Sequence, residues 1–148
     1  KKGLISGEPV GDLIVKLGPL KGVRVGGPIV PRLIDEVPIL AVAAAYAQGK
    51  SLFSGMEELR VKESDRIAVL CREFRKFGVK IQERRDGFVI KGGQPIHGAT
   101  AASHGDHRIA MSLAVLATGA RGRSLIKDVA CIRTSFPQFV PILKRLTS

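Results

Sequence analysis

The chain has 148 residues, 45% of them hydrophobic and 25% charged, which is the composition of a folded domain rather than a disordered tail. No apolar run reaches the roughly 18 residues that a membrane-spanning helix needs, and the first residues lack the pattern of a signal peptide. The formal net charge of +11 favours anionic partners, and nucleic acid, an acidic membrane surface and small phosphorylated substrates are all compatible with it.

Hydrophobic periodicity predicts alternating strands and helices along the chain. In chain order, the expected strands are Leu13–Leu17, Val23–Val25, Ser51–Phe53, Val79–Glu83 and Phe88–Lys91, with Asp86-Gly87 as the turn signal between the last two. An Ala-rich helix is expected over Asp35–Gln48, ending at Gly49. An amphipathic helix is expected over Glu63–Phe77, with Gly78 as its stop. From Val23 to Lys91 the order is therefore strand, helix, strand, helix, strand, strand.

An internal repeat extends this pattern. Ala41–Leu52 reads AVAAAYAQGKSL and Ala114–Leu125 reads AVLATGARGRSL, with seven of twelve positions identical at an offset of 73 residues. The same offset predicts a further helix near Phe136–Leu146. The fold prediction is therefore α/β (α+β) with repeated βαβαββ units, one complete over about 22–91 and a truncated second over about 97–148. The alternative is one complete α/β domain whose two Ala-rich helices are alike by chance.

Basic side chains are expected where two of the helices begin. Lys62 and Arg66 are four residues apart at the first entrance, and Glu63 is within reach of Arg66. Cations at a helix N-terminus oppose the helix dipole at a cost of roughly 0.3–1 kcal/mol each. A bound phosphate or carboxylate would remove that conflict. Solvated charges with some pairing between Glu63 and Arg66 explain a single entrance equally well.

The second entrance repeats the pattern. Asp106 is a good N-cap, which places His107 and Arg108 in the first turn of the helix that follows. With two such entrances in one repeat architecture, we favour an anion site over solvated charge.

Asp35 lies at a third helix start. It is a natural N-cap, and Pro38 is tolerated in the first turn. Capping accounts for Asp35 fully. The second interpretation is a general base that takes a proton from a substrate hydroxyl beside bound anions. Sequence physics alone favours capping.

The histidines and cysteines do not indicate a metal or cofactor. His104 and His107 are three residues apart, but Cys131 is the only distant soft ligand, so an orienting or packing role is favoured. Neither a P-loop nor a dinucleotide-binding fingerprint is present. Cys71 and Cys131 have neither metal spacing nor a disulfide framework, which favours a reducing, cytoplasmic setting.

Three motifs together resemble the 5-enolpyruvylshikimate-3-phosphate synthase family. They are, in order, RVKESDR at 60–66, SHGDHRIAM at 103–111 and TSFP at 134–137; PRLIDEVP at 31–38 and GEP at 7–9 fit as well. The resemblance implies two lobes of βαβαββ units arranged as an inside-out barrel, with the substrates between the lobes. It implies transfer of the enolpyruvyl group of phosphoenolpyruvate to the 5-hydroxyl of shikimate 3-phosphate without a metal or cofactor. The family belongs to aromatic amino-acid biosynthesis and is the target of glyphosate.

The same resemblance implies roles for individual residues. Asp35 resembles the acid that takes the hydroxyl proton of the substrate, and Glu63 resembles the carboxyl group that shuttles a proton at the methylene of phosphoenolpyruvate. The implied substrate-binding positions, besides Asp35, are Lys62 for shikimate 3-phosphate and Arg66 and Arg108 for phosphoenolpyruvate, with His107 in support. Thr134 stands where some members carry a lysine, and no contact is assigned to Arg133.

The ligands that the family takes from its other lobe have no counterpart in this sequence. We therefore expect residues 1–148 to be a partial lobe that is inactive alone and has the missing lobe as a partner, along with phosphoenolpyruvate and shikimate 3-phosphate. The rival interpretations are a basic nucleic-acid-binding module, the sister UDP-sugar enolpyruvyl transferase and a passive supporting lobe. Tyr46 and the six Phe fall mostly at apolar positions, which disfavours stacking on bases, and neither nucleic acid nor membrane is expected as a partner.

Overall fold

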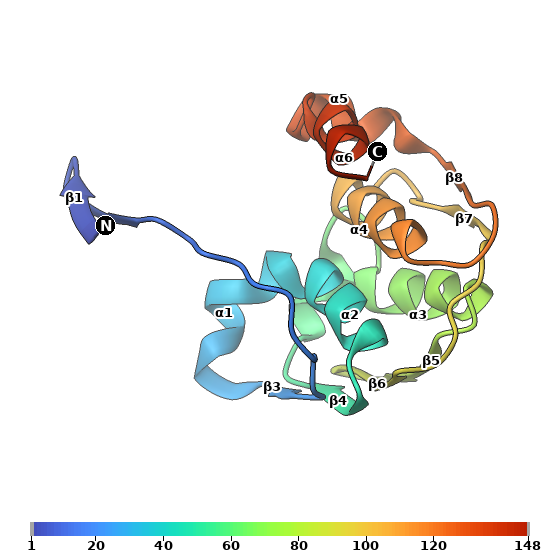
Figure 1. Cartoon of the computed structure of the whole chain (residues 1–148). Helices are drawn as coiled ribbons and strands as arrows, with labels where there is room; N and C mark the ends of the chain where they lie inside the picture. Colours follow the sequence, from blue (N-terminus) through green and yellow to red (C-terminus); the bar gives the residue numbers. More distant parts are fainter. Residues whose placement is uncertain (1, 148) are drawn as a thin grey trace.

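Small β-sheets and the helices that cover them organise residues 2–147, the part of the chain that the computed structural model describes (Figure 1). The strands are β1 (Lys2–Ile5), β2 (Glu8–Gly11), β3 (Arg24–Val25), β4 (Gly49–Phe53), β5 (Lys80–Arg84), β6 (Gly87–Gly92), β7 (Thr100–Ala102) and β8 (Leu125–Lys127). The α-helices are α1 (Val30–Leu33), α2 (Val37–Tyr46), α3 (Arg66–Lys76), α4 (His107–Thr118), α5 (Ile132–Ser135) and α6 (Phe139–Thr147). Short 3-10 turns occur at η1 (Gly27–Ile29), η2 (Ile34–Glu36), η3 (Glu57–Val61) and η4 (Val129–Cys131).

The central sheet has the order β3-β4-β6-β5. β3 and β4 are parallel and are joined through α2, whereas β6 runs antiparallel to both β4 and β5. The β5–β6 hairpin turns at Arg85 and Asp86, and Gly87 follows at φ 156°. Together with α3 these elements form the expected βαβαββ unit.

Helices α2 and α3 cover one face of this sheet, and α4 packs on both of them (Figure 1). The core between sheet and helices is aromatic as well as aliphatic, because Phe53 of β4 stacks on Phe88 of β6 at 4.7 Å between ring centroids. Phe74 and Phe77 from α3 and its C-terminal end are fully buried beside them. The amphipathic face that the sequence predicted for α3 is thus the face that the sheet covers.

The second unit repeats the backbone pairing of the first. Gly22 N donates to Gln48 O at 2.8 Å, and Gly98 N donates to Arg121 O at 2.7 Å. β7 and β8 are parallel and joined through α4, as β3 and β4 are through α2. The repeat predicted from the sequence is confirmed in the fold, while the division into one partial lobe with units at 22–91 and 97–148 stays a prediction.

The expected strand at Leu13–Leu17 is not formed. The segment is extended and exposed between the β1–β2 hairpin, which stands away from the body, and β3 (Figure 1). A strand needs a neighbour for its backbone groups, and no strand of residues 2–147 pairs with this segment. The predicted strand is therefore wrong, because the backbone pairing that a strand requires is not made within the described chain.

Several helix starts also differ from the sequence prediction. α2 begins at Val37 after a 3-10 turn, and α3 begins at Arg66, with Asp65 as its N-cap. The Asp65 side chain accepts a hydrogen bond from Ala68 N at 3.0 Å, so Lys62 and Glu63 precede the helix instead of lying in its first turn. α4 begins at His107 with Asp106 as its N-cap, as predicted. Within residues 2–147, no helix combines the length and the apolar character needed to cross a membrane.

The close approach of the chain at Gly22 gives a test of this architecture. A Cβ at Gly22 would lie 2.4 Å from the carbonyl oxygen of Lys50, whereas a Cβ at Gly18 would meet nothing within 4 Å. We expect Gly22→Ala to lower the free energy of unfolding by about 1–3 kcal/mol because backbone must move to make room. Gly18→Ala should leave it unchanged to within about 0.5 kcal/mol. Urea unfolding measures both, and equal midpoints for the two variants would contradict the observed pairing.

Candidate functional site

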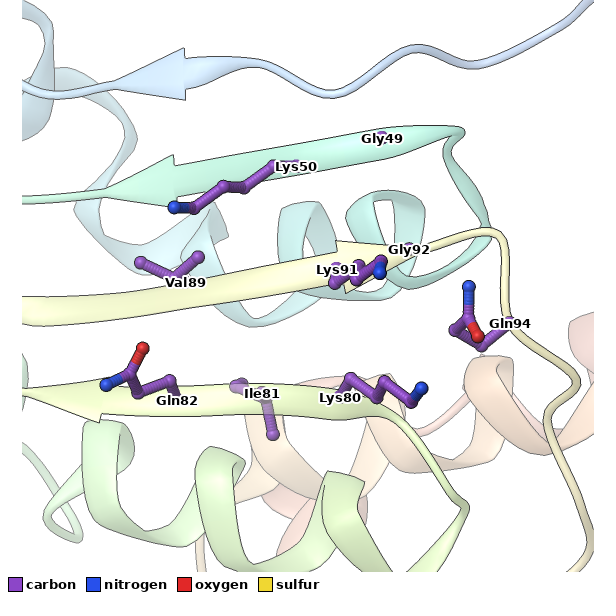
Figure 2. A pocket seen from close by; sticks show the side chains of 9 residues that line it. All are labelled: Gly49, Lys50, Lys80, Ile81, Gln82, Val89, Lys91, Gly92 and Gln94. Atoms are coloured by element: carbon purple, nitrogen blue, oxygen red, sulfur yellow. The ribbon is translucent and has the colours of Figure 1, made fainter.

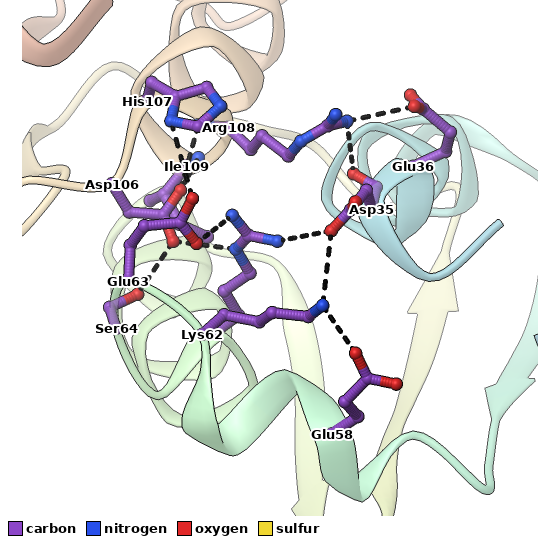
Figure 3. A network of polar contacts seen from close by, with 11 residues as sticks. Asp35, Glu36, Glu58, Lys62, Glu63, Ser64, Asp106, His107, Arg108 and Ile109 are labelled. Atoms are coloured by element: carbon purple, nitrogen blue, oxygen red, sulfur yellow. Dashed lines mark hydrogen bonds and ion pairs between the residues drawn. The ribbon is translucent and has the colours of Figure 1, made fainter. Parts of the chain in front are cut away.

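Arg66 joins acidic side chains that come from the regions where α2, α3 and α4 begin. Figure 3 shows these acids, Asp35, Glu63 and Asp106, gathered in one network. The Arg66 side chain is only 1% exposed and pairs with three carboxylates, a set that we call the Arg66 cluster. Nε donates to Asp106 Oδ2 at 2.7 Å, Nη1 to Asp35 Oδ1 at 2.9 Å and Nη2 to Glu63 Oε2 at 2.6 Å. One guanidinium thus fixes acids from three separate elements relative to one another.

Asp106 is the fully buried member of the Arg66 cluster. Its Oδ1 accepts from the backbone N–H groups of Arg108 and Ile109 at the start of α4, and its Oδ2 accepts from Arg66 and from Ser64 Oγ. Burial alone would raise the pKa of this carboxyl, but the bonds from Arg66 outweigh burial and hold the pKa below its usual value. Asp106 therefore caps α4 and anchors Arg66 at the same time.

Asp35 and Glu63 form the solvent-facing side of the cluster. Their side chains are 47% and 48% exposed, in contrast to Arg66 and Asp106. Asp35 makes no capping hydrogen bond, because α2 starts two residues later. The capping interpretation of Asp35 is therefore wrong. What holds the Asp35 carboxylate in place is Arg66, which leaves its remaining oxygen lone pairs facing the open side of the cluster.

Lys62 and Arg108 lie beside the Arg66 cluster as more accessible cations. Lys62 Nζ contacts Glu58 Oε1 at 2.5 Å and Asp35 Oδ1 at 3.9 Å, and the hydrogen bond to Glu58 raises the pKa of the Lys62 ammonium. Arg108 Nη1 donates to the backbone oxygen of Asp35 at 2.7 Å and to Glu36 Oε1 at 2.9 Å. Both cations thus converge on Asp35 from opposite sides (Figure 3).

The structure brings all the sequence-predicted site residues into one place. The network of Figure 3 includes Asp35, Lys62, Glu63, His107 and Arg108. Arg66 belongs to it through its bonds to Asp35 and Glu63. His107 is the most loosely joined, with Nδ1 3.9 Å from Glu63 Oε1. Their substrate-binding and catalytic roles stay predictions.

Sequence reasoning missed four members of this network: Glu36, Glu58, Ser64 and Asp106, the last of which was assigned only as a cap. Glu58 precedes Lys62 by four residues, a spacing that could have indicated the pair. Glu36 reaches Arg108 across 72 residues, and no local pattern signals such a contact. Among residues 2–147, the network holds the cations Lys62, Arg66 and Arg108 against five carboxylates, so internal acids already compensate the charge that was expected to await an anion.

A second buried acid supports the loop that carries the α4 start. Glu73 of α3 is fully buried and accepts hydrogen bonds from Lys76 Nζ at 2.6 Å and from Ala102 N at 2.9 Å. It also contacts Arg72 and His104, and the residue His104 has a φ of 55°. Burial alone would raise the pKa of Glu73, but these partners lower it to about 2. His104 and His107 thus have different carboxylate partners.

Two hollows matter for the site. A pocket of about 200 Å³ adjoins Asp35, Glu36 and Arg108. Apart from Ser112, its other lining side chains are apolar and come from α2, α4 and the segment around the start of α6. A larger groove of about 670 Å³ lies on the outer face of the central sheet, where Lys50, Lys80 and Lys91 extend from three neighbouring strands (Figure 2). The larger groove contains no carboxylate, whereas Asp35 and Glu36 line the smaller hollow.

Fold and site define an α/β repeat protein whose ionisable residues gather at the starts of its packed helices. Residues 3–143 match the family model of EPSP synthase (3-phosphoshikimate 1-carboxyvinyltransferase). Relatives named 3-phosphoshikimate 1-carboxyvinyltransferase include those of Desulforamulus reducens, 51% identical over 97% of this chain, and Carboxydothermus hydrogenoformans, 56% identical over 96%. A solved EPSP synthase from Acinetobacter baumannii superposes with a TM-score of 0.93 at 37% identity over 98% of this chain.

The chain therefore belongs to the EPSP synthase family, which confirms the resemblance drawn from its motifs. It spans about a third of the length of these relatives: 33% of the two curated proteins and 34% of the solved chain.

The buried ion pair predicts a large loss of stability on its disruption. Arg66→Met leaves Asp106 buried without its cation, and we expect it to lower the free energy of unfolding by about 3–5 kcal/mol. Arg75→Met is the matched control on the same helix, because Arg75 is exposed and donates to the backbone oxygen of Ile81, so this change should cost less than about 1 kcal/mol. Denaturant unfolding measures both. Adding Asp106→Asn to Arg66→Met should restore part of the loss, and a double variant no better than the single one would contradict the pairing.

The lowered pKa of Glu73 predicts that the fold loses stability in acid. Since its pKa in the folded chain is about 2 against the ordinary 4.5, Glu73 stabilises the fold above pH 4.5, and this contribution is lost as the pH falls from 4.5 towards 2. The shift corresponds to about 3 kcal/mol. We expect Glu73→Gln to flatten the fall in unfolding free energy over that interval, measured by urea titration at several pH values. Glu57→Gln, at an exposed position, should retain the slope of the parent chain.

Proposed function

We propose that this chain supplies one wall of the active site of an EPSP synthase. The complete enzyme would transfer the enolpyruvyl group of phosphoenolpyruvate to the 5-hydroxyl of shikimate 3-phosphate and release phosphate. The observation that carries the proposal is that Arg66 holds two half-exposed carboxylates, Asp35 and Glu63, on one side of a network that also presents Lys62 and Arg108.

Two carboxylates suit the chemistry of addition followed by elimination. In the addition step, a base accepts the proton of the attacking hydroxyl while an acid donates a proton to the methylene carbon of phosphoenolpyruvate. In the elimination step, that carbon loses a proton as the bond to phosphate breaks. Asp35 is the proposed base, and Glu63 is the proposed acid, which must first take up the proton that it then donates to the methylene carbon. Because the Arg66 guanidinium bonds to both, their separation is fixed before substrate arrives, which favours proximity catalysis.

Lys62 and Arg108 are proposed to exchange their internal partners for substrate anions. Glu58 and Glu36, which now pair with them, have side chains 61% and 58% exposed and can turn into solvent at little cost. Lys62 would then meet shikimate 3-phosphate, and Arg108 would meet phosphoenolpyruvate with His107 in support. Arg66 is also a proposed phosphoenolpyruvate ligand. Since its side chain is 1% exposed and paired at each nitrogen, a direct bond requires Asp35 or Glu63 to move aside.

The opposite wall of the cleft is proposed to come from a further lobe of the same enzyme. This is consistent with the chain's spanning about a third of its relatives. Catalysis of this kind needs both substrates fixed in a closed, water-poor site, so we propose that the chain alone is inactive. The free thiols of Cys71 and Cys131 are consistent with the proposed cytoplasmic setting. The match to the EPSP synthase family disfavours the alternative that the chain is a nucleic-acid-binding module.

Complementation tests the proposal. The segment of the Desulforamulus reducens relative that this chain does not match is produced separately and mixed with the chain, and phosphate release is followed with both substrates present. We expect turnover only in the mixture. Asp35→Asn and Glu63→Gln should each lower kcat by about 100-fold or more because each removes a proton-transfer group.

Glu57→Gln is the matched control, since Glu57 is an exposed neighbour outside the network of Figure 3. Full turnover by the Asp35→Asn and Glu63→Gln mixtures would overturn the proposed roles, and turnover by the chain alone would overturn its dependence on another lobe.

A further inference from the structure

The outer face of the central sheet carries three lysines that the proposed function does not use. Lys50 of β4 lies directly opposite Lys91 of β6, and Lys91 lies directly opposite Lys80 of β5, a set that we call the lysine row. Side chains alternate between the two faces of a strand, and the neighbouring Ser51 and Ile90 are buried on the side of the helices. The lysine row is therefore exposed on the side away from α2 and α3 (Figure 2).

The lysine row has no internal counter-charge within residues 2–147. The side chains of its three members make neither hydrogen bonds nor ion pairs there, whereas Lys62 and Lys76 each contact a carboxylate. Like charges placed opposite one another on neighbouring strands repel and weaken the pairing. Lysines on an edge strand can serve to prevent aggregation, but of the three only Lys80 lies on an edge strand, β5. Protection of an edge therefore does not explain Lys50 and Lys91.

The lysine row lines the groove of about 670 Å³ on this face. Gln82 and Gln94 add side-chain amides to the lining, and among the described residues the groove has neither acidic nor aromatic lining side chains. A second hollow, of about 320 Å³, shares Lys50 with the groove and adds Arg24 and Arg84 to the basic surface. Each of the four strands thus contributes at least one cation to this face of the sheet.

We propose that this face binds a triphosphate chain, either inorganic or carried by a nucleotide. Neighbouring strands lie about 4.8 Å apart, so the lysine row extends over about 10 Å, a span that linked phosphate groups follow better than a single one. Lysine ammonium groups bind phosphate as point charges, and glutamine amides donate to its oxygens. The bound anion would also remove the repulsion within the row. The lack of aromatic side chains among the described lining residues disfavours nucleic acid, because its bases would have no partner for stacking.

The proposed triphosphate site is separate from the Arg66 cluster. The cluster lies where α2, α3 and α4 begin, whereas the lysine row lies on the face of the sheet that the helices leave uncovered. The inference therefore goes beyond the proposed function and does not depend on it. We expect Asp35→Asn, which removes the proposed base, to leave triphosphate binding intact, whereas a change in the lysine row should weaken it.

Isothermal titration calorimetry with inorganic triphosphate at low ionic strength tests the site. Lys91→Gln removes the central charge of the row, and we expect it to raise Kd at least about fivefold through the loss of a charge-assisted hydrogen bond. Lys144→Gln, at an exposed position of α6, removes the same charge elsewhere and should change Kd by less than about twofold. Equal weakening by the two variants would show a response to net charge alone and would overturn the proposal, as would a parent chain that does not bind.

A stability measurement accompanies the calorimetry. Because Lys91 is exposed and faces two like charges, Lys91→Gln should unfold at the same or a higher urea concentration than the parent chain. Weaker binding by this variant then reflects the lost contact, since the fold is retained. An Asp35→Asn variant that binds triphosphate as weakly as Lys91→Gln would place the anion at the Arg66 cluster and would overturn the separate site.

Further ligands identify the source of the triphosphate. Inorganic phosphate should bind at least about tenfold more weakly than triphosphate, because it reaches only part of the row. An equal Kd for ATP would identify a nucleotide as a suitable source, and a higher Kd for ATP would favour the inorganic chain. Tighter binding of a single-stranded oligonucleotide, with the same dependence on Lys91, would overturn the choice of ligand.

The remaining segment of the enzyme provides the last check. The titration with inorganic triphosphate is repeated in the mixture with the separately produced segment of the Desulforamulus reducens relative. The Kd should stay within about twofold of the value for the chain alone, because the proposed face is turned away from the Arg66 cluster. Loss of binding in the mixture would show that the segment covers the lysine row and would overturn the proposal.

Discussion

The buried ion pair between Arg66 and Asp106 is the interaction on which the rest of the site depends. It joins the start of α3 to the start of α4 through two side chains that are 1% and 0% exposed. Two charges removed from water are tolerated only when their remaining hydrogen-bonding groups are also paired. Asp106 meets this requirement through the α4 N-terminus and Ser64, and Arg66 meets it through Asp35 and Glu63. The buried pair therefore stabilises the core and also fixes the positions of the exposed acids Asp35 and Glu63.

The fold was largely predictable because its signals are local. Apolar periodicity indicated both long helices and the β5–β6 hairpin, and the repeat of Ala41–Leu52 at Ala114–Leu125 indicated a second unit. The segment Leu13–Leu17 shows that a local apolar pattern does not by itself predict a strand. Its pattern fits a strand, yet a strand exists only where a neighbour accepts its backbone hydrogen bonds, and such pairing depends on chain far away in sequence or on another chain.

The sequence predicted which residues gather at the site, but it did not predict which acids pair with which cations. Motif spacing placed Lys62, Arg66 and Arg108 near helix starts, and the structure gathers them. The acids that pair with them come mostly from distant segments: Arg66 reaches Asp35 across 31 residues and Asp106 across 40. Asp35 shows the consequence, since a local rule assigned it to capping while a tertiary contact with Arg66 determines its position. Helix propensity also gave no indication that α3 would begin at Arg66, which leaves Glu63 in the approach to the helix.

The net charge of +11 does not come from an excess of cations at the candidate site. The sequence suggested that cations concentrate at the anion site, but the network around Arg66 contains more carboxylates than cations. Much of the excess lies elsewhere: Lys50, Lys80 and Lys91 stand opposite one another across three strands on the outer face of the central sheet (Figure 2). Like charges in such a row repel and weaken strand pairing slightly. Under the proposed function, an anion would replace the carboxylate partners of Lys62 and Arg108. Selectivity would then depend on the geometry at these two cations, while the field of the whole chain would serve mainly to attract anions.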